Sequence, residues 1–127
     1  MSTILLAEDD PDILHMVAYK LRRAGFEVVE TTDGVAALDA CRREPPDLVL
    51  LDVRMPRMDG IAVCRELRAA PRTGDLPIIM LTARAREQDR ELAVAAGATD
   101  YVVKPFSPRA LVERVETVLA RTAAQRG

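Results

Sequence analysis

The feature that most constrains this sequence is an apolar run that ends in a carboxylate. Residues 48–51 read Leu-Val-Leu-Leu, and Asp52 follows them directly. An uninterrupted run of this length predicts a strand covered on both faces, as in a parallel sheet, because a strand with one wet face alternates apolar and polar residues. In open α/β sheets, ligands bind at the carboxyl ends of the strands. Asp52 is therefore placed for chemistry by its position alone.

The rest of the chain alternates strand-like and helix-like segments. Four further strands are predicted at residues 3–7, 27–31, 77–82 and 100–103. Five helices are predicted at residues 11–24, 34–43, 60–68, 87–96 and 108–121. Strands that alternate with helices over short connections imply parallel strands joined by right-handed crossovers. The predicted fold is α/β, a doubly wound five-stranded parallel sheet with helices on both faces, forming one domain over residues 1–121 with a flexible tail at 122–127.

Charge and composition exclude several classes of protein. The chain has 18 Lys plus Arg against 20 Asp plus Glu, a net charge of -2, so it has no basic excess for direct binding to nucleic acid or to an anionic membrane. Its apolar runs are strand-sized and leave neither a signal peptide nor a spanning helix, so we expect a cytoplasmic protein. Cys41 and Cys64 lack C-x-x-C spacing and are expected in the core as small hydrophobic side chains.

Polar residues stand at the carboxyl ends of four predicted strands. Glu8 and Asp9 follow the first strand, Asp52 the third, Thr82 the fourth and Lys104 the last. Taken singly, Thr82 is an ordinary β-branched strand residue and Lys104 an ordinary surface charge. Together they meet at one edge of the sheet, where two adjacent acids beside a third would repel strongly unless a cation lay among them. The sequence therefore predicts a cleft with three carboxylates, a hydroxyl and an ammonium.

This set of residues resembles the receiver domain of two-component response regulators. The resemblance rests on Glu8-Asp9, Asp52, Thr82-Ala83 and Lys104-Pro105-Phe106, with Met55-Pro56 and Asp59-Gly60 between them. It runs from about Thr3 to Arg121 in the same order, with the family's typical distances, such as the 30 positions between acceptor and hydroxyl. It implies the flavodoxin-like (βα)5 fold with strand order 2-1-3-4-5, for which a chemotaxis regulator of this family is a known example.

The resemblance also implies a chemical role for each acid. Asp52 would accept a phosphoryl group from a phosphohistidine of a sensor histidine kinase or a phosphotransfer protein, forming an acyl phosphate. Glu8, Asp9 and Asp52, with the backbone carbonyl of Arg54, would hold Mg2+ or Mn2+, which prefer hard oxygen ligands. Such a chain is a phosphoacceptor regulator and not a conventional enzyme, since it catalyses only its own phosphorylation and dephosphorylation.

Four other residues receive roles from the same resemblance. Lys104, the Thr82 hydroxyl and the backbone N–H of Ala83 would contact the phosphoryl oxygens. Thr82 would be drawn toward the added charge, and Tyr101 would rotate into the space it leaves. The surface formed by the fourth helix, the last strand and the fifth helix would change as a result. The fourth helix is rich in alanine, with only Leu92 and Val94 as larger apolar residues, which predicts the loosest packing of the five.

Residues 98–111 resemble the winged-helix transcription-factor branch of this family, in which an active homodimer forms through that changing surface. Asp100 and Arg114 match one charged pair of the dimer interface. Ala96 and Ala110 stand where charged partners would be expected. The output of the domain is therefore left open between such a dimer and a surface-reading partner protein.

The residues favour the switch over two other functions. A phosphorylation-independent interaction module of the same fold is disfavoured because the acid pair, acceptor, hydroxyl and ammonium are all intact. A hydrolase resembling the haloacid dehalogenase family would usually carry a second acid two residues after the nucleophile, and that position is Arg54. Arg54 and Arg84 are instead expected to cover the phosphoryl group and slow its hydrolysis, the alternative being that both form weak surface pairs.

Overall fold

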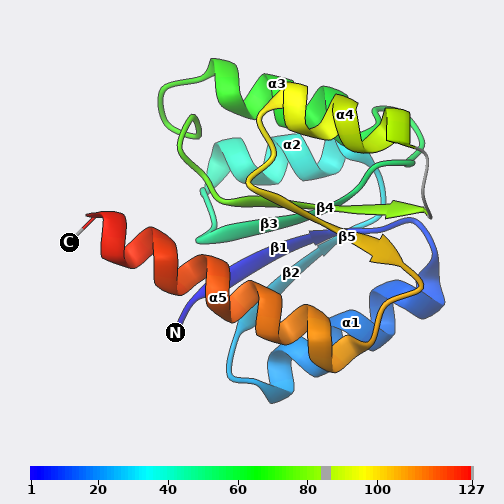
Figure 1. The fold of residues 1–127 in the computed structure, drawn as a ribbon, viewed down its shortest axis with the longest axis vertical. Coiled ribbons are helices and arrows are strands. Elements are labelled where there is room, and N and C mark those ends of the chain that lie inside the picture. Colours follow the sequence, from blue (N-terminus) through cyan, green and yellow to red (C-terminus); the bar gives the residue numbers. More distant parts are fainter. Residues whose placement is uncertain (84–86, 127) are drawn as a thin grey trace.

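The computed structural model describes residues 1–83 and 87–126 and contains a five-stranded parallel sheet (Figure 1). The strands are β1 (Thr3–Ala7), β2 (Glu27–Thr31), β3 (Leu48–Asp52), β4 (Ile78–Ala83) and β5 (Asp100–Lys104). The helices are α1 (Pro11–Arg23), α2 (Gly34–Arg43), α3 (Gly60–Ala69), α4 (Glu87–Ala96) and α5 (Pro108–Arg126). The strand order is β2-β1-β3-β4-β5, which confirms the doubly wound fold and the order implied by the resemblance.

Each face of the sheet has its own hydrophobic core. Helices α1 and α5 cover one face, and α2, α3 and α4 cover the other (Figure 1). In β3, Leu48 and Leu50 pack on the α1 and α5 side, whereas Val49 and Leu51 pack on the opposite side, and all four are fully buried. The continuous apolar run is thus explained by a strand with no wet face, and it carries Asp52 to the carboxyl edge of the sheet.

The connections that flank the sheet edge follow local sequence signals. The Asp10 side chain caps α1 by accepting hydrogen bonds from two backbone N–H groups of its first turn, at 2.9 and 3.3 Å. Asp59 caps α3 in the same way, at 2.8 Å. Gly25 and Gly97, with φ of 99° and 97°, lie just beyond α1 and α4 in the left-handed conformation that commonly ends helices. These caps confirm the predicted ends and leave Glu8 and Asp9 in the connection after β1, with Asp52 as the last residue of β3.

Helix α4 packs through its small side chains. Ala93 and Ala96 are buried against the core, whereas Leu92 is 45% exposed and Val94 61% exposed. The two larger apolar residues of α4 are thus exposed, and the buried contacts of the helix are made by alanines.

Both cysteines lie in the core between the sheet and the α2, α3 and α4 layer. Burial raises the pKa of the Cys41 thiol to about 12 and also raises that of Cys64. Because a thiol is a nucleophile or metal ligand only as the thiolate, these values fit the predicted role as small core side chains.

Helix α5 continues to Arg126, beyond the predicted boundary at residue 121. The division into a domain over 1–121 and a flexible tail over 122–127 stays a prediction. Within residues 1–83 and 87–126, no helix is both long and apolar enough to cross a membrane.

Candidate functional site

Three carboxylates gather where β1 and β3 end. Glu8 is fully buried, Asp52 is 4% exposed and Asp9 is exposed. One oxygen from each of these carboxylates lies within 4.8 Å of the others. Because β1 and β3 are neighbours in the sheet, residues just past their carboxyl ends meet. The structure therefore brings together the acids that the sequence assigned to one cleft.

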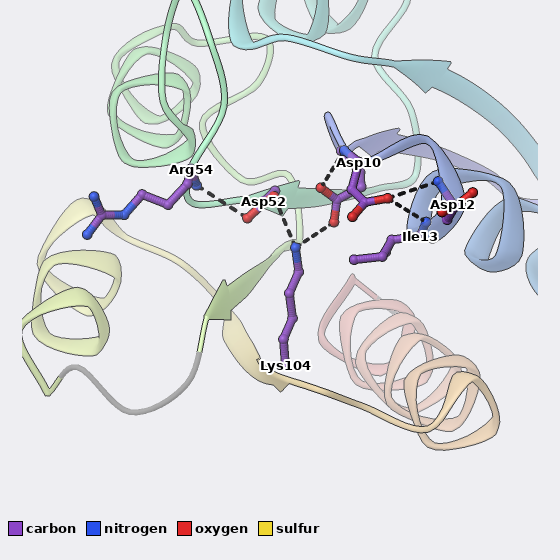
Figure 2. Close-up of polar contacts among 7 residues, drawn as sticks. Asp10, Asp12, Ile13, Asp52, Arg54 and Lys104 are labelled. Carbon is purple, nitrogen blue, oxygen red and sulfur yellow. Dashed lines mark hydrogen bonds and ion pairs between the residues drawn. The ribbon is translucent and has the colours of Figure 1, made fainter.

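Lys104, the last residue of β5, also contacts this cluster. Its Nζ lies 2.6 Å from Glu8 Oε1 and 3.1 Å from Asp52 Oδ2 (Figure 2). The side chain reaches past β4, which separates β5 from β3, and only 20% of it is exposed. Three carboxylates thus face one ammonium, which leaves an excess of two negative charges when all of them are ionised. A divalent cation matches that excess, and the all-oxygen donor set fits Mg2+ or Mn2+.

Backbone N–H groups fix the two buried carboxylates. The N–H of Arg54 donates to Asp52 Oδ1 at 3.2 Å, and the N–H of Asp10 donates to Glu8 Oε2 at 3.2 Å (Figure 2). Each carboxylate therefore has one oxygen on the Lys104 ammonium and the other on the backbone. Their orientation is held by three groups, from the connection after β1, the connection after β3 and the end of β5, which makes the site preorganised.

The pKa values of the cluster reflect this crowding. Burial and the neighbouring Asp52 raise the pKa of Glu8, and the hydrogen bond from Lys104 offsets only part of the rise. Burial by itself would lower the pKa of Lys104, but hydrogen bonds and charges of Glu8 and Asp52 outweigh it, so the pKa is raised. Lys104 therefore stays an ammonium at neutral pH and supplies a fixed positive charge beside Asp52.

Thr82 and Ala83 end β4, between the strands of Asp52 and Lys104. Thr82 is 4% exposed and lies opposite Val103 of β5. Ala83 pairs in register with Lys104, which places its backbone at the same edge of the sheet. All the strand-end residues that the sequence selected are thus found at one edge.

Tyr101, the residue predicted to move, lies partly buried on β5. It packs against the core beneath α2, α3 and α4. The guanidinium carbon of Arg90, from α4, lies 4.9 Å from the centre of its ring, a cation–π contact. This contact connects α4 with β5. Nearby, Arg114 Nη1 of α5 lies 2.8 Å from Asp100 Oδ2. These two residues match a charged pair of the dimer interface in sequence, but here they pair with each other within one chain.

Arg54 does not cover Asp52 in the structure. Its Nη2 lies 3.4 Å from both carboxylate oxygens of Asp89 in α4. Sequence reasoning missed this pair, although one signal was available: Asp89 stands four and seven positions before Ala93 and Ala96, on the buried stripe of the helix. Arg84, the other predicted shield, lies outside the described residues.

Comparison with known proteins agrees with the fold. Residues 4–116 match the response regulator receiver domain family. The alkaline phosphatase synthesis transcriptional regulatory protein PhoP of Bacillus subtilis is 43% identical over 119 residues, which are 94% of this chain and 49% of PhoP. The transcriptional regulatory protein BaeR of Escherichia coli is 43% identical over 123 residues, 97% of this chain and 50% of BaeR. The chain therefore spans about half the length of the curated relatives it matches.

One solved structure of similar fold contains a metal ion. The receiver domain of the sensor histidine kinase PA1611 from Pseudomonas aeruginosa PAO1 has a TM-score of 0.88 and 36% identity, covering 94% of this chain and 98% of that one. That crystal structure has a magnesium ion coordinated in its active site cleft. With the sheet order, the cluster at the strand ends and the match over residues 4–116, this chain belongs to the response regulator receiver domain family.

Proposed function

We propose that this domain is a phosphorylation-dependent signalling switch of a two-component system and that Asp52 is its phosphoacceptor. The observation that carries the proposal is the buried Asp52 carboxylate, held between the Lys104 ammonium at 3.1 Å and the Arg54 N–H at 3.2 Å beside two further acids. In the transfer, an oxygen of Asp52 attacks the phosphorus of a phosphohistidine, the P–N bond breaks and the imidazole leaves. The domain would catalyse only its own phosphorylation and dephosphorylation.

Glu8, Asp9, Asp52 and the backbone carbonyl of Arg54 would hold Mg2+ or Mn2+. The excess of negative charge in the cluster and its oxygen-only side chains support this assignment. Such an ion would supply positive charge that offsets the acids and the incoming phosphoryl group. The protein's own part is to keep Glu8 and Asp52 oriented, through the two backbone N–H groups that they accept.

Lys104, Thr82 and the backbone N–H of Ala83 would bind the remaining phosphoryl oxygens. Lys104 is already an ammonium beside Asp52, so it needs no change of charge to pair with the phosphoryl group. The Thr82 hydroxyl would move toward the added charge, and Tyr101 would follow it inward. Since Tyr101 contacts Arg90 of α4, that movement would alter the α4-β5-α5 surface.

The partners proposed are a sensor histidine kinase or phosphotransfer protein upstream, in the cytoplasm, and a reader of the α4-β5-α5 surface downstream. One such reader is a second copy of the chain. Asp100 and Arg114 match a charged pair of such a dimer interface in sequence, but here they pair with each other within one chain at 2.8 Å, Ala96 is buried and Ala110 carries no charge. An interaction module that ignores phosphorylation is less well supported, because it would have no use for the concentrated negative charge.

We expect labelling of the domain by a small phosphodonor to require a divalent cation. Chelation should lower the labelling rate on the order of tenfold or more, since the acids would then repel the incoming phosphoryl group. Calorimetry would measure Mg2+ binding by two variants. Asp9→Asn should weaken the binding, whereas Asp10→Asn should change it little because the Asp10 carboxylate caps α1. Equal labelling with Mg2+ and with chelator would contradict the metal site. A larger effect of Asp10→Asn would show that the acid pair has been misassigned.

A further inference from the structure

Arg54 connects the candidate phosphoacceptor to α4. Its backbone N–H donates to Asp52 Oδ1 at 3.2 Å, and its guanidinium Nη2 lies 3.4 Å from both oxygens of Asp89. Figure 2 shows the long side chain extending away from Asp52. Asp89 lies near the start of α4, and α4 forms one side of the α4-β5-α5 surface. A single residue therefore contacts both the reacting carboxylate and the helix that is expected to respond.

The two residues of this ion pair differ in how far their side chains are exposed to solvent. The Arg54 side chain is 64% exposed, whereas that of Asp89 is 11% exposed. Their separation of 3.4 Å is long for a charge-assisted hydrogen bond, so the guanidinium is weakly held. Arg90, the next residue of α4, contacts the Tyr101 ring. Among the described residues, Arg54 is the cation that pairs with the largely buried Asp89, while the exposed Arg54 guanidinium can be solvated by water elsewhere.

A phosphoryl group on Asp52 would compete for the same guanidinium. It would add roughly -1.5 to -2 charge beside the backbone of Arg54, taking phosphoserine as the guide. The planar fork of arginine matches phosphate oxygens well, and its side chain is long enough to turn back over its own backbone. The phosphoryl group therefore has both more charge and more acceptor oxygens than Asp89 to offer Arg54.

We propose that Asp89 is a positioning residue for the phosphoryl group, acting through Arg54. The guanidinium lies on Asp89 while Asp52 is a simple carboxylate, and it moves onto the phosphoryl group when Asp52 is phosphorylated. The inference rests on the proposed function of Asp52 and deepens it. Transfer of Arg54 leaves the largely buried Asp89 carboxylate without this cation, so the start of α4 must rearrange. This is a second connection from the site to α4, separate from that through Thr82 and Tyr101.

The exchange also sets the lifetime of the acyl phosphate. In hydrolysis, a water oxygen bonds to phosphorus, the bond from phosphorus to the Asp52 oxygen breaks, and inorganic phosphate and a proton are released. A guanidinium on the phosphoryl group hinders the approach of that water. Asp89 draws Arg54 away and thereby shortens the lifetime.

The test follows decay of the labelled domain after the phosphodonor is removed. Asp89→Asn is expected to slow the decay about fivefold, a typical coupling between sites, because Arg54 is then retained by the phosphoryl group. Arg54→Ala should speed the decay, and adding Asp89→Asn to Arg54→Ala should change nothing further. Asp33→Asn is the matched control, because Asp33 pairs with Arg57 at 3.5 Å. The Asp33 side chain is 15% exposed and that of Arg57 63% exposed, and asparagine can still cap α2.

Each outcome separates this inference from the function it rests on. Unchanged or faster decay in Asp89→Asn, or equal slowing in the Arg54→Ala background, would overturn the exchange while leaving Asp52 as the acceptor. Equal slowing in Asp33→Asn would overturn it too, since any lost carboxylate would then suffice. A wild-type domain that takes no label at Asp52 would overturn the proposed function and this inference together.

Discussion

Replacing Gly60 with alanine is expected to destabilise the domain by about 3 kcal/mol, the upper end of typical overpacking costs. A Cβ at this position would lie 2.3 Å from the carbonyl oxygen of Asp52 and 3.1 Å from its carbonyl carbon. These are backbone atoms of β3, and β3 is paired on both sides in the sheet. The Gly60 N–H also donates to the Val53 carbonyl at 2.9 Å, so the two segments cannot separate without loss of that bond. Urea unfolding would measure the effect.

The same change should impair phosphorylation, because the clash displaces the end of β3 that carries Asp52. Labelling per folded molecule should fall in Gly60→Ala. Gly74→Ala is the control: its nearest neighbour would be the Ala70 carbonyl oxygen at 3.2 Å, in a connection remote from the site. Its stability should stay within about 1 kcal/mol of wild type. Equal stability of the two variants would contradict the close approach of Gly60 to β3.

Lys104→Met should destabilise the domain by about 2 kcal/mol when a chelator is present. The variant leaves Glu8 and Asp52 facing each other without the ammonium that now lies 2.6 and 3.1 Å from them. The full cost of breaking a buried pair is higher, but Lys104 is partly exposed and water would reach the cluster. Mg2+ should restore part of the loss, since a divalent cation neutralises the same carboxylates. Thermal unfolding with Mg2+ and with chelator would measure both effects.

Arg114→Met serves as the matched control for Lys104. It also removes a cation from a short ion pair, with Asp100 at 2.8 Å, but 45% of the Arg114 side chain is exposed. Exposed pairs contribute less than about 1 kcal/mol, and Mg2+ should have no effect there. If both variants lost the same stability, or if Mg2+ gave Lys104→Met no recovery, the cluster would not be the charge-crowded site described above.

The fold could be predicted from sequence because its signals are local. The Leu48–Leu51 run is buried on both faces, and Gly25 and Gly97 end their helices in the left-handed conformation. The meeting of Asp52 with Lys104 was also predictable, although they are 52 positions apart, because the carboxyl ends of parallel strands share one edge. The chemical roles came from family resemblance, and they stay predictions until labelling tests them.

Side-chain direction was harder to predict. Arg54 and Asp89 are 35 positions apart on different elements, and nothing in their spacing distinguishes an arginine over Asp52 from one paired with α4. The direction depends on which carboxylate is near and how deeply it is buried, which follows from tertiary packing. Leu92 and Val94 illustrate the same limit, since they lie outside while smaller alanines make the contacts of α4.

The most direct test of the central claim is to identify the residue that carries the phosphoryl group. The domain would be phosphorylated with a small phosphodonor and Mg2+, then treated with borohydride, which reduces an aspartyl phosphate to homoserine, and its peptides would be analysed by mass spectrometry. Homoserine at position 52, with no labelling of Asp52→Asn, is the predicted result. Modification at another residue, such as Asp9 or His15, or undiminished labelling of Asp52→Asn, would contradict it.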